Sequence, residues 1–346
     1  PNEITFTCIL KACGSIGALD KGKQIHNEII VRHLLENNIV LGSALVDMYA
    51  RCGYLAEAEY GFYKLSEQDI ISYSALIAGY AELGLCDEAL NSLGSMRSDG
   101  IIPDEITFVS ILKACGSVQD IDSGLQIHAE IIKEEFERDI FIGNKLVDFY
   151  AKCGMLEKAQ QVHDELPVRN VVSWNALISA YVGHGQPHKA LNCFQHMLSQ
   201  GCLYPDHVTF LCVLKSCCNL AQILKGREIH ADVLKIGVFE TNQFVGNALV
   251  DMYAKCGMIE KARQSLLNLP VRDVVSWSAL IAGYTQQRQC EEALNCFDQM
   301  QNEGISPDAI TFISILKACG STKAIHKGKQ IHDEIVRRGM LGENAV

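Results

Sequence analysis

The stretch TFTCILKACGS at residues 5–15 returns three times with few changes. Its copies are TFVSILKACGS at 107–117, TFLCVLKSCCN at 209–219 and TFISILKACGS at 311–321, and successive copies start 102 residues apart. Self-similarity at a fixed distance is the signature of a repeat architecture, in which similar units stack on one another. The sequence therefore predicts an array of like units, and the functional question becomes what a row of similar surfaces binds.

Two further families of copies subdivide the 102-residue period. One comprises LVDMYARCG at 45–53, LVDFYAKCG at 146–154 and LVDMYAKCG at 249–257; the other comprises IISYSALIAGY at 70–80, VVSWNALISAY at 171–181 and VVSWSALIAGY at 274–284. We expect a single repeat array over 1–346, with units at 3–38, 39–69, 70–104, 105–139, 140–170, 171–206, 207–242, 243–273, 274–308 and 309–344. The two residues at either end are expected to be edges of neighbouring units, so that the chain is cut from a longer array.

Within a unit, apolar residues recur at helical spacing on both sides of a glycine turn. In the unit at 171–206 they are Trp174, Leu177, Ile178 and Tyr181 before the turn, and Ala190, Leu191, Phe194, Met197 and Leu198 after it. Gly183 and Gly185 separate the two runs, and Pro187 suits the first turn of a helix. Neither helix covers its apolar stripe alone, which predicts an all-α chain: an α-solenoid, a right-handed superhelix of about ten helix–turn–helix motifs.

Composition and motifs argue against several functions. No run approaches 18 consecutive apolar residues, so no membrane span is expected. The zinc nucleobase deaminases combine His-x-Glu with Cys-x-x-Cys, and Cys-x-x-Cys is absent. We therefore expect no enzyme, metal or cofactor, and the His-x-Glu matches are interpreted as structural positions on second helices: His26/Glu28, His128/Glu130, His163/Glu165 and His332/Glu334. The recurring cysteines are expected to be small buried residues of a reduced protein: Cys13, Cys115, Cys217, Cys319, Cys52, Cys153 and Cys256.

The units resemble the pentatricopeptide repeat family. Gly-x-x-Pro-Asp closes units at 100–104 and 304–308, and LVDMYAKCG, VVSWNALI and LKACG followed by KGKQIH match its plant-type subclass, in which P, long (L) and short (S) motifs alternate. The S units would be 39–69, 140–170 and 243–273, the P units 70–104, 171–206 and 274–308, and the remaining four L units. Ser66 in place of the proline at 167 and 270, and a turn at 286–289 without its usual glycine, depart from the pattern.

The resemblance implies binding of single-stranded RNA with one base per repeat, read by the fifth and the last residue of each unit. These base-reading pairs would be Thr7/Asn38, Ser43/Asp69, Ser74/Asp104, Val109/Asp139, Asn144/Asn170, Asn175/Asp206, Leu211/Asn242, Asn247/Asp273, Ser278/Asp308 and Ile313/Asn344. The second residue of each unit would sandwich the base; this sandwiching row is Ile4, Val40, Ile71, Ile106, Phe141, Val172, Val208, Phe244, Val275 and Ile310.

The chemistry of the paired side chains fits such reading. An Asp carboxylate accepts from the ring N–H of guanine or uracil, whereas an Asn amide donates to the ring nitrogen of adenine or cytosine. A short Ser or Thr leaves room for a purine, and the longer Asn reaches a pyrimidine. The pairs predict A-G-G-n-C/U-U-n-U-G-n, where n marks the aliphatic Val109, Leu211 and Ile313. The alternative is that the Asp and Asn residues only cap helices.

The resemblance makes this stretch the recognition tract of a plant organellar C-to-U RNA editing factor, in the mitochondrion or the chloroplast. A deaminase domain or organellar editing-factor proteins would be its partners, beside the RNA. The alternative is a helical scaffold that binds proteins. The net charge of −11 argues against a nucleic-acid binder, and the cations expected to offset it in the groove are Lys11, Lys113, Lys215 and Lys317, with Arg51, Lys152 and Lys255.

Overall fold

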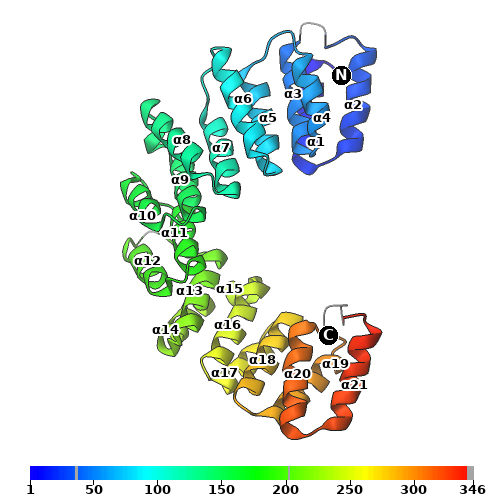
Figure 1. Cartoon of the computed structure of the whole chain (residues 1–346), viewed down its shortest axis with the longest axis vertical. Coiled ribbons are helices and arrows are strands. Elements are labelled where there is room, and N and C mark those ends of the chain that lie inside the picture. The colour runs from blue at the N-terminus through cyan, green and yellow to red at the C-terminus, as the bar shows by residue number, and fades with distance from the viewer. Residues whose placement is uncertain (36–37, 202, 341–346) are drawn as a thin grey trace. The chain divides into compact units, whose positions relative to one another are not determined.

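The computed structural model describes residues 1–35, 38–201 and 203–340, and no strand occurs in these ranges (Figure 1). Their α-helical content confirms the predicted all-α fold. The first helices of the ten pairs are α1 (Glu3–Ile16), α3 (Ile39–Arg51), α5 (Ile70–Glu82), α7 (Glu105–Val118), α9 (Ile140–Lys152), α11 (Val171–Gly183), α13 (His207–Leu220), α16 (Gln243–Lys255), α18 (Val274–Gln286) and α20 (Ala309–Thr322).

Each first helix is followed by a second helix after a short turn. The second helices are α2 (Leu19–Val31), α4 (Leu55–Tyr63), α6 (Cys86–Ser98), α8 (Ile121–Lys133), α10 (Leu156–Glu165), α12 (Pro187–Ser199), α14 (Ile223–Ile236), α17 (Ile259–Leu267), α19 (Cys290–Asn302) and α21 (Ile325–Arg337). A short 3-10 helix (Phe136–Arg138) and the one-turn α15 (Val238–Thr241) follow two of the L-unit second helices.

The chain divides into two compact parts, residues 1–180 and 181–346, and each is described by itself. In the first part, α1, α3, α5, α7 and α9 form a row in which each first helix contacts the next. In the second part, α13, α16, α18 and α20 form a row in the same way. Within each part, second helices lie against the first helices of their own units, for example α4 on α3 and α19 on α18 (Figure 1). First helices therefore make one layer and second helices another.

The repeated Thr-Phe motif anchors every L unit through its aromatic ring. Phe6, Phe108, Phe210 and Phe312 are each at most 2% exposed. Burying one such side chain stabilises the fold by roughly 1.5–3 kcal/mol. The same residue type at the same place in each copy thus supplies the packing that a single helix pair lacks.

The turn that departs from the family pattern keeps the usual backbone. Gly84 and Gly185 hold the turns of two P units with φ values of 72° and 68°. In the third P unit Arg288 takes this place with a φ of 61°. A side chain in the left-handed region costs roughly 1–2 kcal/mol. The substitution therefore leaves the turn geometry intact and lowers the stability of the turn.

The histidines of the His-x-Glu matches lie on second helices, as predicted. In three L units the ring Nδ1 lies at hydrogen-bond distance from the tyrosine hydroxyl of the next first helix: His26–Tyr49 at 2.8 Å, His128–Tyr150 at 2.6 Å and His230–Tyr253 at 2.8 Å. Burial lowers the pKa of each of these L-unit histidines. His163 is fully buried with its ring centroid 4.3 Å from that of Trp174, and His332 is exposed beside Asp333. The histidines that are buried in this way stabilise the packing in their neutral form.

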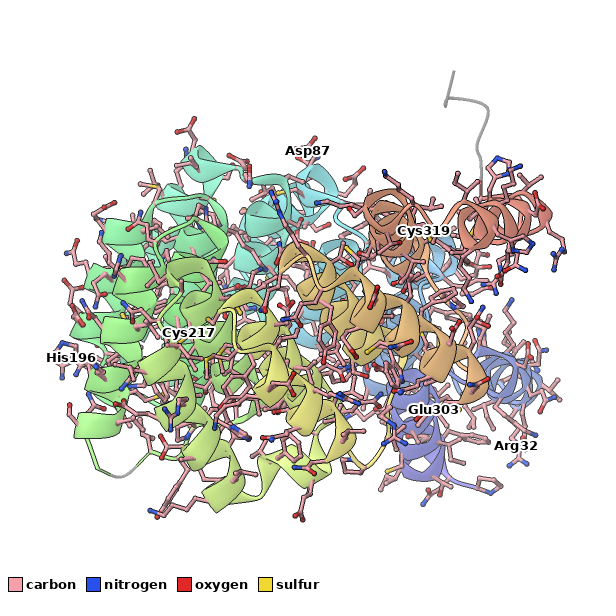
Figure 2. The ribbon with its side chains drawn as sticks, turned by 90° about the horizontal axis from the view of Figure 1, so that it is seen from below. Arg32, Asp87, His196, Cys217, Glu303 and Cys319 are labelled. Atoms are coloured by element: carbon pink, nitrogen blue, oxygen red, sulfur yellow. The ribbon has the colours of Figure 1, made fainter. Side chains whose placement is uncertain are left out.

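The cysteines fall into two groups. Cys13, Cys115, Cys217 and Cys319 are at most 5% exposed, and Figure 2 labels Cys217 and Cys319. Burial raises the pKa of Cys217 to about 12. The expectation of burial is wrong for Cys52, Cys153 and Cys256, which are half-buried because each sits at the carboxyl end of a first helix. Among the described residues, no cluster of His, Cys, Asp or Glu fits a metal ion, and no helix is long and apolar enough to cross a membrane.

Candidate nucleic-acid interface

The last residue of a unit caps the first helix of the next unit at every described position. In all nine cases the side-chain Oδ1 accepts a hydrogen bond from a backbone N–H three residues on, at 2.8–3.2 Å. The nine are Asn38, Asp69, Asp104, Asp139, Asn170, Asp206, Asn242, Asp273 and Asp308. Asn344, the tenth, lies outside the described residues. An Asp or Asn at this position typically stabilises a helix by ~1 kcal/mol relative to Ala.

Five of the predicted base-reading pairs are joined by hydrogen bonds although 26 to 30 residues separate their members. The hydroxyls of Ser43, Ser74 and Ser278 donate to Oδ1 of Asp69 at 2.9 Å, Asp104 at 3.3 Å and Asp308 at 3.1 Å, respectively. The amide Nδ2 of Asn144 donates to Oδ1 of Asn170 at 3.5 Å, and that of Asn247 to Oδ2 of Asp273 at 2.9 Å. The stacking of one unit on the next therefore places both members of these pairs in one polar cluster.

Thr7 and the aliphatic fifth residues are not joined to a last residue in this way. The Thr7 hydroxyl donates to the carbonyl of Glu3 within its own helix, at 3.0 Å. Val109, Leu211 and Ile313 have no polar atom to offer, and Ile313 is 68% exposed. Asn175 and Asp206 belong to the two separate parts of the chain: Asn175 is buried, and Asp206 caps α13.

The capping hydrogen bond determines which side-chain atom of the last residue stays available for a hydrogen bond to a ligand. In Asp69, Asp104 and Asp308 the inward Oδ1 takes the hydrogen bonds, and no described residue donates to Oδ2. In Asn170 the cap also uses Oδ1, which leaves the two protons of Nδ2. An Asp at this site thus presents an acceptor and an Asn presents a donor, except that both oxygens of Asp273 already accept hydrogen bonds. Capping and base reading use different atoms, and the two interpretations of these residues are compatible.

The members of the predicted sandwiching row are apolar side chains that solvent reaches. Nine of its ten members are large exposed hydrophobics, from Ile71 at 49% to Ile4 at 73%, and Val208 is half-buried. Isolated exposed apolar residues are ordinary on protein surfaces. Here, however, they recur at the second residue of each unit, two positions after the capping residue. The flat faces of nucleic-acid bases are a natural partner for such a row.

Four of the fifth residues are far less accessible than sequence reasoning assumed. Ser43 is fully buried, and Ser74, Ser278 and Asn247 are 5–6% exposed. Each lies between adjacent first helices and points its polar group at the last residue of its unit. A ligand at this surface would therefore meet these residues mainly through that last residue.

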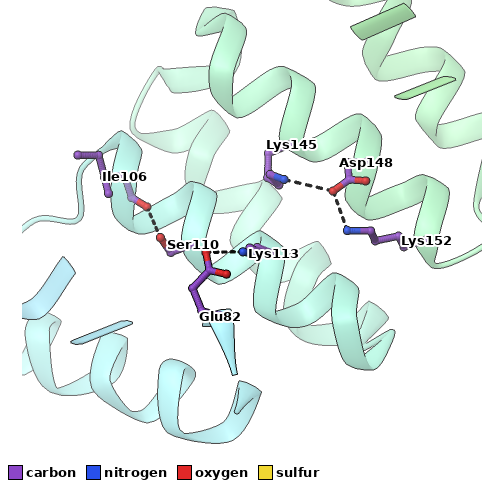
Figure 3. Close-up of polar contacts among 7 residues, drawn as sticks. All are labelled: Glu82, Ile106, Ser110, Lys113, Lys145, Asp148 and Lys152. Atoms are coloured by element: carbon purple, nitrogen blue, oxygen red, sulfur yellow. Dashed lines mark hydrogen bonds and ion pairs between the residues drawn. The ribbon is translucent and has the colours of Figure 1, made fainter. Parts of the chain in front are cut away.

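Several cations that were expected to offset the acidic charge carry their own counter-ions. Arg51 pairs with Asp47 at 2.7 Å, Lys152 with Asp148 at 2.9 Å and Lys255 with Asp251 at 2.7 Å, always one helical turn apart. Figure 3 shows Lys145 on the same Asp148 carboxylate. It also shows Lys113 paired with Glu82 of the preceding first helix, at 2.5 Å. Lys11, Lys215 and Lys317 are exposed and form no ion pair with any described residue.

Sequence reasoning missed two sets of residues at this interface. The acidic partners of the S-unit cations stand in the repeated motif LVDxYAK or LVDxYAR, where a spacing of four residues predicts an ion pair. The third residue of each P and L unit was also missed. It is Ser72, Ser173 or Ser276 in the P units and Thr5, Thr107, Thr209 or Thr311 in the L units, and its backbone N–H completes the cap. An Asp followed three residues later by Ser or Thr is the signal that would have found it.

The comparison with known families agrees with this geometry. The PPR repeat family matches residues 68–117, 169–219 and 272–321, and the PPR repeat matches 144–171 and 247–266. This chain belongs to the pentatricopeptide repeat (PPR) family. The matches cover more than half of the chain and include members of each of the three unit types.

Full-length relatives of this PPR chain occur in Arabidopsis thaliana. A chloroplastic pentatricopeptide repeat-containing protein is 38% identical over 320 residues, which are 92% of this chain and 51% of the relative. A mitochondrial one is 38% identical over 335 residues, which are 96% of this chain and 43% of the relative. The chain thus spans about half the length of the curated relatives it matches.

Among solved structures, the PPR protein PPR10 in complex with an 18-nucleotide psaJ RNA element shares the fold. The TM-score is 0.75 at 19% sequence identity, and the match covers 96% of this chain and 50% of PPR10. At this identity the likeness concerns the stacked helix pairs and not the individual side chains.

Proposed function

We propose that this PPR chain binds single-stranded RNA in a sequence-specific manner, with one base per repeat unit. The observation that carries the proposal is the set of five base-reading pairs joined at helix amino ends. At four of them a capped carboxylate or amide turns one atom inward to the helix and keeps the other available, whereas Oδ2 of Asp273 accepts from Asn247 and Gln243. Such an atom is either an acceptor or a donor, so a row of them discriminates between bases by their ring nitrogens.

The sandwiching row supplies the sequence-independent share of the affinity. Stacking of a base on an aromatic side chain is worth roughly 1–3 kcal/mol, and Phe141 and Phe244 offer such rings at 70% exposure. The aliphatic members bury apolar surface against the base faces. Each base is then held between successive second residues while its edge meets the last residue of a unit.

The family and its solved structures support this proposal. PPR10, whose fold this chain shares, is bound to an 18-nucleotide RNA element. Relatives of this chain are chloroplastic or mitochondrial proteins, which favours an organelle as its location. Within the plant-type subclass, we propose that it serves as the recognition tract of a C-to-U RNA editing factor. The deaminase would be another domain or another protein, because the chain lacks Cys-x-x-Cys.

The paired cations predict a modest contribution of phosphate contacts. Only Lys11, Lys215 and Lys317 remain of the seven cations expected in the groove. For single strands, each neutralised phosphate contributes about −0.7 to the slope of log K against log salt concentration, so three contacts give a slope of about −2 and seven would give about −5. A measured slope near −5 would contradict the assignment of the ion pairs. An acidic chain can therefore bind RNA if base contacts supply the main share.

A direct test compares the predicted RNA with a permuted one. The protein is titrated by fluorescence anisotropy against A-G-G-A-C-U-A-U-G-A and against an RNA of the same composition in scrambled order. We expect the predicted RNA to bind at least tenfold more tightly, since each mismatch typically costs about 1–3 kcal/mol at nucleic-acid interfaces. Equal affinities would refute the base assignment. Binding of neither RNA would favour a protein ligand for the helical array.

A further inference from the structure

Two P units share a polar cluster with a residue that belongs to the following L unit. In the first, the Thr107 hydroxyl donates to Oδ1 of Asp104 at 2.7 Å and lies 2.7 Å from the hydroxyl of Ser74. The backbone N–H of Thr107 donates to the same oxygen at 2.8 Å. The cluster at Ser278, Asp308 and Thr311 repeats these contacts at 2.6–3.1 Å, and there the Ser278 hydroxyl also lies 2.6 Å from the Val274 carbonyl. Thr107 and Thr311 are fully buried.

Counting protons in the first cluster shows how the carboxylate is held. Ser74 and Thr107 have one hydroxyl proton each, and an ionised carboxylate only accepts. In one arrangement the Thr107 hydroxyl donates to Oδ1, and the Ser74 hydroxyl donates either to the Thr107 oxygen or to Oδ1. In the other arrangement the Thr107 hydroxyl donates to the Ser74 oxygen, and the Ser74 hydroxyl donates to Oδ1. In both arrangements the hydroxyl protons stay inside the cluster, and Oδ1 accepts at least one of them besides the backbone N–H. Oδ1 is thereby fixed inward and Oδ2 is the oxygen left for a ligand.

The type of the third residue follows the type of unit in front of it. After P units it is Thr107, Thr209 or Thr311, whose hydroxyl donates to the preceding Asp in each case. After L units it is Leu41, Ile142 or Val245, and only its backbone N–H reaches the cap. Two of those L units have aliphatic fifth residues, Val109 and Leu211. In the two described cases with an aliphatic fifth residue, the last residue therefore receives no such hydroxyl from the next unit.

We propose that the third residue of an L unit is a positioning residue for the base that the preceding P unit reads. Thr107 turns Oδ1 of Asp104 inward so that Oδ2 accepts from the ring N–H of guanine, and Thr311 does the same for Asp308. The proposal rests on the function proposed above and gives the L units a part in base selection. Although their own fifth residue is aliphatic, they determine how precisely the neighbouring unit discriminates.

The test removes one hydroxyl and keeps the shape of the side chain. Thr107→Val lacks the donor, so the carboxylate of Asp104 loses a charge-assisted hydrogen bond and can rotate. Affinities are measured for A-G-G-A-C-U-A-U-G-A and for the same RNA with adenine at the third base. We expect the preference of the variant for guanine at that base to fall about tenfold relative to the wild-type protein. Thr107→Ser retains the hydroxyl and should restore the preference.

Two controls lie within the same molecule. The guanine preference at the second base depends on Asp69, whose cap uses the Ser72 backbone, and that at the ninth base depends on Asp308 and Thr311. Both preferences should stay unchanged in Thr107→Val. If this variant does not fold, Thr107→Ala removes the hydroxyl without adding a methyl group beside Asp104, and the corresponding pair of variants at Thr311 tests the ninth base.

The outcomes separate the inference from the function on which it rests. A wild-type protein that binds the RNA but does not distinguish guanine from adenine at the third base overturns both. A wild-type preference that Thr107→Val leaves intact overturns only the inference. Thr107→Val can also weaken binding to both RNAs equally, so that the ratio of the guanine to the adenine affinity is unchanged. In that case Thr107 supports the fold and not the selection of the base, and this also overturns the inference.

Discussion

Asp308→Asn tests whether a capping residue also reads a base. The wild-type Oδ1 accepts from the Thr311 N–H at 2.8 Å, the Thr311 hydroxyl at 2.7 Å and the Ser278 hydroxyl at 3.1 Å. An Asn at this site must keep its oxygen at the inner position, because a flipped amide would turn its own N–H groups toward those donors. Its Nδ2 therefore takes the place of Oδ2 and presents protons to the RNA. Asn170 and Asn242 already cap helices in this way.

The expected size of the effect follows from reversing one hydrogen bond. Guanine at the ninth base loses its acceptor and faces a donor, while adenine gains a donor for its ring nitrogen. If each change is worth about 1.4 kcal/mol, within the range of about 1–3 kcal/mol for a mismatch, the ratio of guanine to adenine affinity changes about 100-fold. The stability of the fold should stay within about 0.5 kcal/mol, since Asn and Asp cap helices equally well.

The assay measures the affinity of both proteins for the guanine and adenine versions of the ninth base by fluorescence anisotropy, with thermal unfolding in parallel. Asp308→Ala is the matched control: it loses the cap, should lower stability by about 1 kcal/mol, and should weaken binding to both RNAs. The guanine preference at the third base, which we propose that Asp104 reads, should be the same in all three proteins. An unchanged ratio at the ninth base in Asp308→Asn would show that Asp308 is only a cap.

Further expectations concern the neighbouring polar contacts, pH and the turns. Gln243→Ala removes the 2.6 Å hydrogen bond to Oδ2 of Asp273 and leaves that oxygen with Asn247 as its one described donor. The variant should raise the affinity for uracil at the eighth base about two- to fivefold, since a lone pair of that oxygen becomes available to the base. A loss of affinity would mean that Gln243 itself contacts the base. Burial holds the pKa of the L-unit histidines below 6.5, so the unfolded chain binds protons first as pH falls. The unfolding temperature should therefore be constant above pH 7 and decrease from pH 6.5 towards pH 5, whereas a flat profile would contradict the neutral His–Tyr contacts. Arg288→Gly relieves a left-handed side-chain conformation and should stabilise the protein by about 1 kcal/mol in chemical denaturation, while Gly84→Ala should destabilise it by a similar amount.

The repeat pattern predicted the fold because the signals for helices and turns are carried by single residues. Apolar spacing and glycine turns indicated the helix pairs, and the capping chemistry of Asp104 and Asp308 indicated where first helices begin. The contact of Ser43 with Asp69 came from the resemblance alone, since 26 residues separate the two. Burial of Ser43 could not be foreseen, because it depends on how closely one unit stacks on the next.

The charges were the weakest part of the sequence-based prediction. Lys113 and Lys152 were assigned to the groove as cations, but each lies beside a carboxylate in the structure. For Lys152 the partner is four residues away and could have been anticipated. For Lys113 the partner, Glu82, belongs to the preceding first helix, so that their proximity arises only from stacking. A count of charged residues in the sequence does not distinguish a cation that is free to contact phosphate from one that is paired with a carboxylate.

The ion pairs of Arg51, Lys152 and Lys255 have a kinetic consequence. A chain with a net charge of −11 and internally paired cations exerts little long-range attraction on a polyanion, so RNA meets it by unassisted diffusion. Association rates without electrostatic steering are about 10⁵–10⁶ M⁻¹s⁻¹, against up to 10⁸–10⁹ M⁻¹s⁻¹ with it. The lifetime of the complex must then account for most of the difference between a matching and a non-matching RNA. Such a protein would dissociate quickly from unrelated transcripts and slowly from its matching RNA.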